Sequence, residues 1–237
     1  MKDVRFAPLL VLALAACTPQ QKPSGPDDSL REHERAIVMT VNVQETSQLK
    51  VGQWARYSAR TSGSPAVYST RLSVVAAEGG NYWIENRTNS PGSGSGLKVA
   101  VVKYQIDAAA KPLQMWYAES GANPLKIYPG KDAAGNPIQL ARPPEQDSKS
   151  KVDIAKESIT IHHTGKMFDC TRLTSKATYP DGRETKMTTW CSPEVPFAVV
   201  YNGNSYGGVV RRTYGEYTLE LDAKGTDAVA ELALPDK

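Results

Sequence analysis

The stretch that decides the fold is Tyr68–Ile84, which reads YSTRLSVVAAEGGNYWI. From Tyr68 to Val74, apolar or β-branched residues at every second position alternate with Ser and Arg. A period of two is typical of a β-strand with one buried face. The run stops at Gly79-Gly80, and aromatic and β-branched residues resume directly afterwards. Two such runs around a Gly-Gly turn predict a β-hairpin.

Further runs of the same kind follow along the chain. Leu97–Ile106 carries apolar residues on both faces, which predicts a central strand. Shorter β-like runs come after it: Leu113–Tyr117, Leu125–Tyr128, Ser158–His162 and Tyr217–Leu221. No segment has the pattern of an amphipathic helix of three turns, although Val38–Leu49 fits either a helix or a strand. We therefore predict a mainly β fold, a curved antiparallel sheet or open half-barrel with few short helices.

Residues 1–16 predict a signal peptide. Lys2 and Arg5 precede an apolar run that is far too short for a membrane span of about 20 residues. The run ends in Leu14-Ala15-Ala16-Cys17, which resembles the lipobox of bacterial lipoproteins, in which the cysteine is acylated and becomes the new N-terminus. The alternative is an ordinary secretory signal with an incidental cysteine. We predict cleavage before Cys17 and lipidation of that residue, which anchors the chain to a membrane.

Residues 17–35 predict a flexible tether, and residues 36–237 predict a single β-rich periplasmic domain. The tether is rich in Pro and polar residues, so it buries too little apolar surface to offset its ordering entropy. Thr18 follows the lipidated cysteine, where the resemblance to Gram-negative lipoproteins implies that Asp would retain the protein in the inner membrane. We therefore expect a protein of the cell envelope that is anchored in the outer membrane and faces the periplasm.

Composition argues against several classes of protein. The 237-residue chain has a formal net charge of +3, and its basic residues are scattered, so we expect no nucleic-acid partner. Only three His and three Cys are present, which leaves few ligands for a zinc or redox centre. We therefore expect no cofactor and no metal site.

With Cys17 assigned to the lipid, Cys170 and Cys191 remain. They lie in β-like runs on either side of Pro180-Asp181-Gly182, a turn signal. If Pro180 and Asp181 form a two-residue loop, opposed positions have numbers that sum to 361, as 170 and 191 do. A Gly bulge would shift the sum by one and leave the two cysteines near neighbours. Because export leads to an oxidising compartment, we predict a structural disulfide between these residues, with two free buried thiols as the alternative.

No motif indicates catalysis. A Ser-His-Asp arrangement needs a nucleophile on a sharp turn, and none can be assigned here. No two of the acidic residues can be assigned as an acid and a base. His162-His163 is expected in a strand, where neighbouring side chains point to opposite faces, so the two cannot bind one metal without distortion. We interpret them as one half-buried and one solvated imidazole. Gly203–Gly208 opens no helical pattern, so we predict a loop between strands and no phosphate loop. We expect no catalytic residues and no enzymatic activity.

Several short motifs resemble a group of bacterial lipoproteins of largely unknown function. These motifs are Val51–Trp54 with Tyr57, Gly80–Glu85, Thr164–Cys170, Trp190–Pro196 and Tyr214-Gly215. The group is similar to lipoprotein carriers of the LolA/LolB type, whose fold is a curved antiparallel sheet with helices that close an apolar cavity for acyl chains. The chain departs from that pattern at the Pro- and Gly-rich Asp132–Asp147 and shows no lid helices. The resemblance implies a fold and a lipid-binding role, and it implies no functional residue.

We therefore expect a membrane-anchored, non-enzymatic envelope lipoprotein whose half-barrel binds an apolar ligand, either a lipid or an acyl chain. The apolar runs Leu97–Val102 and Leu113–Tyr117 support this expectation, although such strands also fill ordinary cores. The alternative is an accessory or structural lipoprotein that docks onto an outer-membrane protein complex through exposed aromatic residues such as Trp116 or Tyr206. An open apolar cavity favours the first function, and a filled core with an exposed apolar patch favours the second.

Overall fold

The computed structural model describes residues 41–64, 67–91, 97–127, 149–178, 182 and 184–234. These residues form strands and connecting turns, and they contain no helix. The strands are β1 (Trp54–Thr61), β2 (Val67–Glu78), β3 (Asn81–Pro91), β4 (Leu97–Ile106), β5 (Pro112–Glu119), β6 (Leu125–Ile127), β7 (Lys149–Thr160), β8 (Met167–Thr178), β9 (Glu184–Ser192), β10 (Ala198–Tyr201), β11 (Asn204–Tyr214) and β12 (Tyr217–Gly225).

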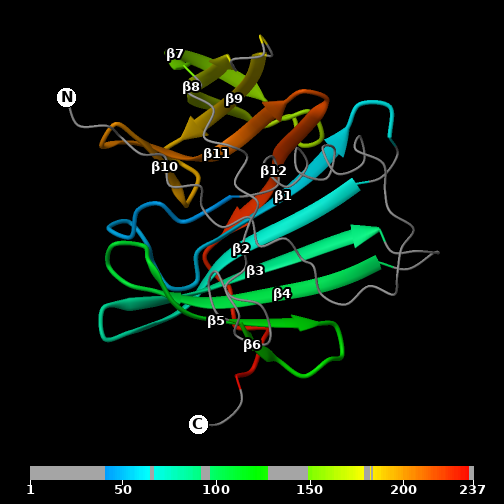
Figure 1. Cartoon of the computed structure of the whole chain (residues 1–237), viewed down its shortest axis with the longest axis vertical. Helices are drawn as coiled ribbons and strands as arrows, with labels where there is room; N and C mark the ends of the chain where they lie inside the picture. The colour runs from blue at the N-terminus through cyan, green and yellow to red at the C-terminus, as the bar shows by residue number, and fades with distance from the viewer. Residues whose placement is uncertain are drawn as a thin grey trace.

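The strands form one antiparallel sheet in the order β6-β5-β4-β3-β2-β1-β12-β11-β9-β8-β7, with β10 paired to β11. The sheet is open, because β6 and β7 lie at opposite ends of this order. In Figure 1 the strands β7 to β9 lie at the top and run across the direction of β2 to β5, so the sheet is strongly twisted. The predicted curved antiparallel sheet is confirmed. The expected short helices are absent from the described part of the chain, where short turns and loops connect the strands.

The first and last strands pair with each other in the middle of the sheet. Tyr57 of β1 lies opposite Leu221 of β12, and Ala59 lies opposite Leu219. Strands β2 to β6 follow one another as hairpins on one side of this pair, and β7 to β11 form the other side. We call these two sides the β2–β6 arm and the β7–β11 arm, and we call the β1–β12 pair the seam.

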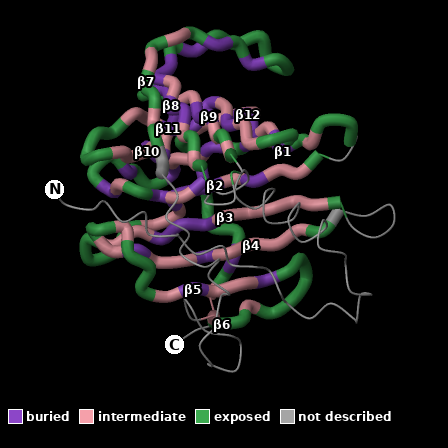
Figure 2. The backbone as a smooth tube through the Cα atoms, turned by 45° about the horizontal axis from the view of Figure 1, so that its top comes forward, coloured by how far each residue is buried: buried purple, intermediate pink, exposed green. Residues whose placement is uncertain are grey.

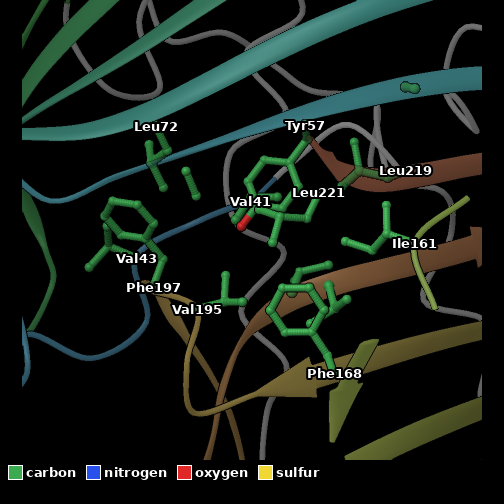
Figure 3. Packing of buried hydrophobic residues seen from close by; sticks show 14 of the residues in the cluster. Val41, Val43, Tyr57, Leu72, Ile161, Phe168, Val195, Phe197, Leu219 and Leu221 are labelled. Atoms are coloured by element: carbon green, nitrogen blue, oxygen red, sulfur yellow. The ribbon is translucent and has the colours of Figure 1, made fainter. Parts of the chain in front are cut away.

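The core lies around the seam. Figure 2 shows that buried residues gather on the strands at and beside the seam, while the outer strands carry more half-buried and exposed residues. The core side chains come from both arms and from the segment before β1 (Figure 3): Val41, Val43, Tyr57, Leu72, Ile161, Phe168, Val195, Phe197, Leu219 and Leu221. Burial of a side chain of this size contributes about 1.5–3 kcal/mol, so the seam is the part of the sheet that packing stabilises most.

The hairpin read from Tyr68–Ile84 is confirmed. Strand β2 pairs with β3, and the turn residues Gly79 and Gly80 have φ values of 59° and 83°, which glycine adopts without strain. Leu97–Ile106 is a strand with the predicted bounds. Its residue Val102 is only half-buried, however, because the middle of the sheet lies at the seam and β4 lies in an arm.

Residues 226–234 cross one face of the β2–β6 arm, and we call them the C-terminal strap. The carboxylate of Glu85 accepts hydrogen bonds from the backbone N–H groups of Glu231 at 2.8 Å and Leu232 at 3.1 Å. The ammonium of Lys103 donates to the carbonyl of Leu232 at 2.8 Å and lies 3.3 Å from Glu85. Because Glu85 neighbours the core residue Ile84 on the strand, the strap lies on the face opposite to the core.

Candidate functional site

A polar groove of about 710 Å³ lies on one face of the β7–β11 arm, and we call it the sheet groove. Its lining consists of Lys151, Asp153, Arg172, Thr174, Lys176, Lys186, Thr188, Trp190, Thr213 and Gly215. The strand register explains this set, because directly opposed residues of antiparallel strands share a face and every second residue along a strand returns to it. The lining therefore falls into cross-strand rows.

The outer row consists of lysines. Lys176 of β8 lies directly opposite Lys151 of β7 on one side and Lys186 of β9 on the other. All three side chains are exposed. Gly215, in the turn after β11, also lines the groove and adds no side chain to it. The outer row thus presents three ammonium groups at the rim of the groove.

The middle row consists mainly of threonines. Thr174 lies opposite Asp153 on β7 and Thr188 on β9, and Thr213 of β11 lies opposite Thr188. The hydroxyl oxygens of Thr174 and Thr188 are 3.5 Å apart, and both residues are buried. Each hydroxyl is both a donor and an acceptor, so this row supplies hydrogen-bonding groups on rigid strands.

The inner row is fixed by a half-buried acid. Arg172 and Trp190 lie opposite each other on β8 and β9. One carboxylate oxygen of Glu157 accepts from Arg172 at 2.9 Å, and the other accepts from the indole N–H of Trp190 at 2.5 Å. Arg172 also reaches Asp153 at 3.5 Å. Because both side chains are held by hydrogen bonds, the floor of the groove is preorganised.

The inner row continues to β12 of the seam, where it meets an ion-pair cluster. Arg211 lies opposite both Trp190 and Glu220, and it donates to the Glu220 carboxylate and to the carbonyl of Thr160. Burial raises the pKa of Glu220, but the hydrogen bonds and charge of Arg211, with a hydrogen bond from His163, outweigh burial and hold that pKa below its ordinary value of 4.5. Glu220 is therefore charged at neutral pH.

The histidine pair does not lie in a strand, so that prediction was wrong. Strand β7 ends at Thr160, and His162 and His163 occupy the turn before β8, where Gly165 has a φ of 66°. The imidazole of His163 lies between two carboxylates. Its Nδ1 is 3.4 Å from Glu220, and its Nε2 is 3.1 Å from Asp222. Sequence reasoning missed these acids, because they lie about 60 positions away on β12.

The cluster around His163 is not arranged for nucleophilic catalysis. The hydroxyl of Ser58 donates to Asp222 at 2.5 Å, and it makes no hydrogen bond to His163. An activated serine needs a base that accepts its hydroxyl proton. Here both imidazole nitrogens of His163 face carboxylates. Only the doubly protonated imidazole donates to both carboxylates at once. The geometry is that of an ion-pair cluster next to the groove.

The hairpin that carries the two remaining cysteines has a register other than the predicted one. Cys191 lies opposite Thr171, and the last pair before the turn is Thr178 with Glu184. The connection therefore spans residues 179–183, and the numbers of opposed residues sum to 362, as 171 and 191 do. Cys170 is shifted by one position, and neighbours on a strand point to opposite faces.

The predicted disulfide is not formed in the structure. Cys170 and Cys191 are free thiols, and both are buried. Burial is the main cause that raises the pKa of Cys170 to about 11 and that of Cys191 to about 12. A buried thiol with a raised pKa is a poor nucleophile near neutral pH.

Other predicted features are placed as follows. Cys17 and Asp132–Asp147 lie outside the described residues, so lipidation stays a prediction. The predicted loop Gly203–Gly208 is mostly strand, because β11 begins at Asn204. Trp116 and Tyr206 are half-buried. In the described part of the chain, no helix is long and apolar enough to cross a membrane, and no group of three or more His, Cys, Asp or Glu side chains is arranged to hold a metal.

Comparisons with known proteins return no family model, no curated protein and no solved structure that matches this chain. The resemblance to carriers of the LolA/LolB type therefore stays a prediction. Only the geometry of this chain therefore supports a site at the sheet groove and the ion-pair cluster beside it.

Proposed function

We propose that the protein is a membrane-tethered, non-enzymatic binding protein of the bacterial envelope, and that its ligand occupies the sheet groove. The observation that carries the proposal is the groove itself, which combines exposed ammonium groups, threonine hydroxyls and a floor that Glu157 holds in place. Side chains on strands are positioned more rigidly than those on loops, which suits recognition. Lipid on Cys17 and the Pro-rich tether would keep this surface close to a membrane.

The chemistry of the lining supports binding over turnover. Among its described residues, Thr174, Thr188 and Thr213 are the hydroxyl groups, and no histidine shares the groove with them. Arg172 and Trp190 are engaged by Glu157, so they hold their orientation without a ligand. A site of this kind recognises hydrogen-bonding and charged groups and supplies no activated nucleophile.

Site-specific photo-cross-linking in living cells tests the proposal. A photoreactive amino acid at Thr213, half-buried in the groove, should give a discrete adduct. The same amino acid at Lys98, exposed on β4 and outside the groove, is the matched control. An adduct at Thr213 that disappears when Thr188 is replaced by a larger residue supports the groove as the binding site. Equal labelling at both positions, or none at Thr213, would contradict it.

A second candidate is the apolar ligand that the sequence predicts. Val102, Tyr117 and Leu125 lie directly opposite one another on β4, β5 and β6. Leu125 is 61% exposed, and the other two are half-buried, so this row is an apolar surface outside the filled core. It lies at the far end of the sheet from the groove.

Mass spectrometry of lipid extracted from the purified protein tests this second candidate. Bound lipid that is lost in a Val102→Asp variant supports it, while Lys98→Gln is the control that should retain the lipid. Absence of lipid from the wild-type protein contradicts it. A protein that cross-links at Leu125 in place of lipid would favour docking onto an outer-membrane complex.

A further inference from the structure

The lysine row at the rim of the groove is an arrangement that destabilises a sheet. Directly opposed side chains have Cβ atoms about 4.5–5.5 Å apart, and like charges at that spacing repel. Lys151, Lys176 and Lys186 form two such pairs in succession. Among the described residues, no carboxylate lies within ion-pair distance of any of the three ammonium groups. The fold therefore contains a repulsion that its own described side chains do not neutralise.

The same molecule shows how such a row is neutralised. Arg56, Arg71 and Arg87 lie directly opposite one another on β1, β2 and β3. Here the chain supplies anions, because Glu231 of the C-terminal strap lies 2.6 Å from Arg87 and 3.7 Å from Arg71. Asp222 lies 3.8 Å from Arg56. A row of three opposed cations thus holds carboxylates that reach it from another segment of the chain.

The charge of the groove lining also favours an anionic ligand. Lys151, Lys176, Lys186 and Arg172 line the groove with one carboxylate, that of Asp153. Arg172 is engaged by Glu157 and Asp153, which leaves the lysines for a ligand. Three opposed positions span about 10 Å at the spacing of neighbouring strands, so the row matches several anionic groups in succession better than a single one. The groove volume of about 710 Å³ is in the range of small-molecule sites.

We propose that the sheet groove binds a ligand that carries several phosphate groups, with Lys151, Lys176 and Lys186 contacting the phosphates and the threonine row donating hydrogen bonds beneath them. This proposal rests on the proposed function of the groove as the ligand site. Ammonium groups on flexible stems suit phosphate oxygens, which accept charge-assisted hydrogen bonds from several donors. The phosphate groups come either from a soluble oligophosphate or from phospholipid headgroups.

Calorimetric titration of the full-length protein in non-ionic detergent tests the proposal, with inorganic tripolyphosphate as the soluble probe. Co-sedimentation with phosphatidylglycerol vesicles tests the headgroup source. Vesicles of phosphatidylcholine, whose headgroup has no net charge, are the reference for binding through the lipid anchor alone. We expect Lys176→Gln to weaken binding at least about tenfold, because it removes the central charge of the row, whereas Lys98→Gln leaves binding unchanged. Binding should also weaken as salt is raised.

A stability measurement separates ligand binding from a structural role. Lys176→Gln removes a like-charge repulsion, so the ligand-free variant should unfold at the same or a higher urea concentration than the wild type. Loss of binding together with loss of stability would contradict the proposal. So would an absence of binding to both probes, or equal binding by the Lys176→Gln and Lys98→Gln variants. If phosphate binding fails but the Thr213 cross-link persists, only the ligand class is wrong. If both fail, the proposed function fails as well.

Discussion

The carboxylate of Glu85 on β3 accepts the backbone N–H of Leu232, which lies 147 positions later in the chain. The same carboxylate pairs with Lys103, whose ammonium donates to the carbonyl of Leu232. The side chains of Glu85 and Lys103 are 4% and 10% exposed, so this ion pair is shielded from water. This buried pair therefore holds the C-terminal strap through backbone groups, so the contact does not depend on which side chains the strap carries.

Removal of one partner of this pair should be strongly destabilising. Glu85→Gln leaves the Lys103 ammonium buried without its counter-charge, and we expect the free energy of unfolding to fall by about 3–5 kcal/mol. Glu231→Gln is the matched control. Because Glu231 is 29% exposed, its pairs with two arginines contribute about 0–1 kcal/mol. Urea denaturation measures both, and similar losses in the two variants would contradict the buried role of Glu85.

Acid should destabilise the protein in part through Glu220. Its pKa in the folded protein lies below the ordinary value of 4.5, so its contribution to stability is present above that value and is lost as the pH falls through the folded-state pKa. The Glu220→Gln variant should lack this contribution at neutral pH and lose less stability between pH 7 and pH 3 than the wild type. Urea midpoints over that range measure the difference. Parallel curves for the two proteins would exclude the role of Glu220.

The two buried cysteines should resist alkylation in the folded state. Their raised pKa values leave little thiolate at pH 8, and burial restricts access of a reagent. Iodoacetamide should modify neither residue before unfolding and both after unfolding in urea without a reductant, as peptide mass spectrometry would show. A linked peptide pair in the unreduced sample would instead establish the disulfide that the sequence predicts.

Gly208 should not tolerate a side chain. A Cβ atom at this position would lie 2.0 Å from the carbonyl oxygen of Pro196, which is a backbone atom and cannot rotate away. The N–H of Gly208 also donates to the carbonyl of Val195 at 2.9 Å. We expect Gly208→Ala to destabilise the protein by about 1–3 kcal/mol or more through overpacking. Gly121→Ala is the comparison, because at a φ of 80° with open space around it a side chain adds backbone strain without a steric clash. Thermal unfolding that ranks Gly121→Ala as the worse variant would contradict the close contact at Gly208.

Replacement of Cys17 tests the anchor. Cys17→Ser removes the thiol that the lipobox provides for acylation, so the variant should accumulate as an unprocessed or mislocalised precursor. Membrane fractionation with metabolic labelling by a fatty-acid analogue measures this outcome. A variant that fractionates and migrates like the wild type would show that the resemblance to the lipobox is incidental.

Local sequence patterns predicted the strands well. In a half-buried strand, apolar and polar residues alternate, and this pattern can be read without knowing which strands lie beside it. Thus Tyr68–Ile84 predicted the β2–β3 hairpin, and Leu97–Ile106 predicted β4. Register was harder to predict. The Pro180-Asp181-Gly182 signal suggested a two-residue loop, whereas the structure connects β8 and β9 through residues 179–183, a shift of one position that separates the two cysteines.

The groove was not predicted, because its lining comes from four strands whose mutual registers a single sequence does not specify. A signal was nevertheless present: Lys176 and Lys186 lie at nearly equal distances from the same turn. With the predicted register they would not oppose each other, and with the observed register they do. The partners of His163 are on β12, a strand that local reasoning had no cause to place beside the turn.

The seam has a consequence for how the chain is made. Ser58 and Asp222, which hydrogen-bond across it, are 164 positions apart, so β1 has no partner on that side until β12 has been synthesised. An edge strand without a partner is a template for aggregation. We expect chains that end before Tyr217 to aggregate or to be degraded, as solubility after expression would show. Each newly made molecule thus passes through an interval in which a strand of the buried seam is an exposed edge.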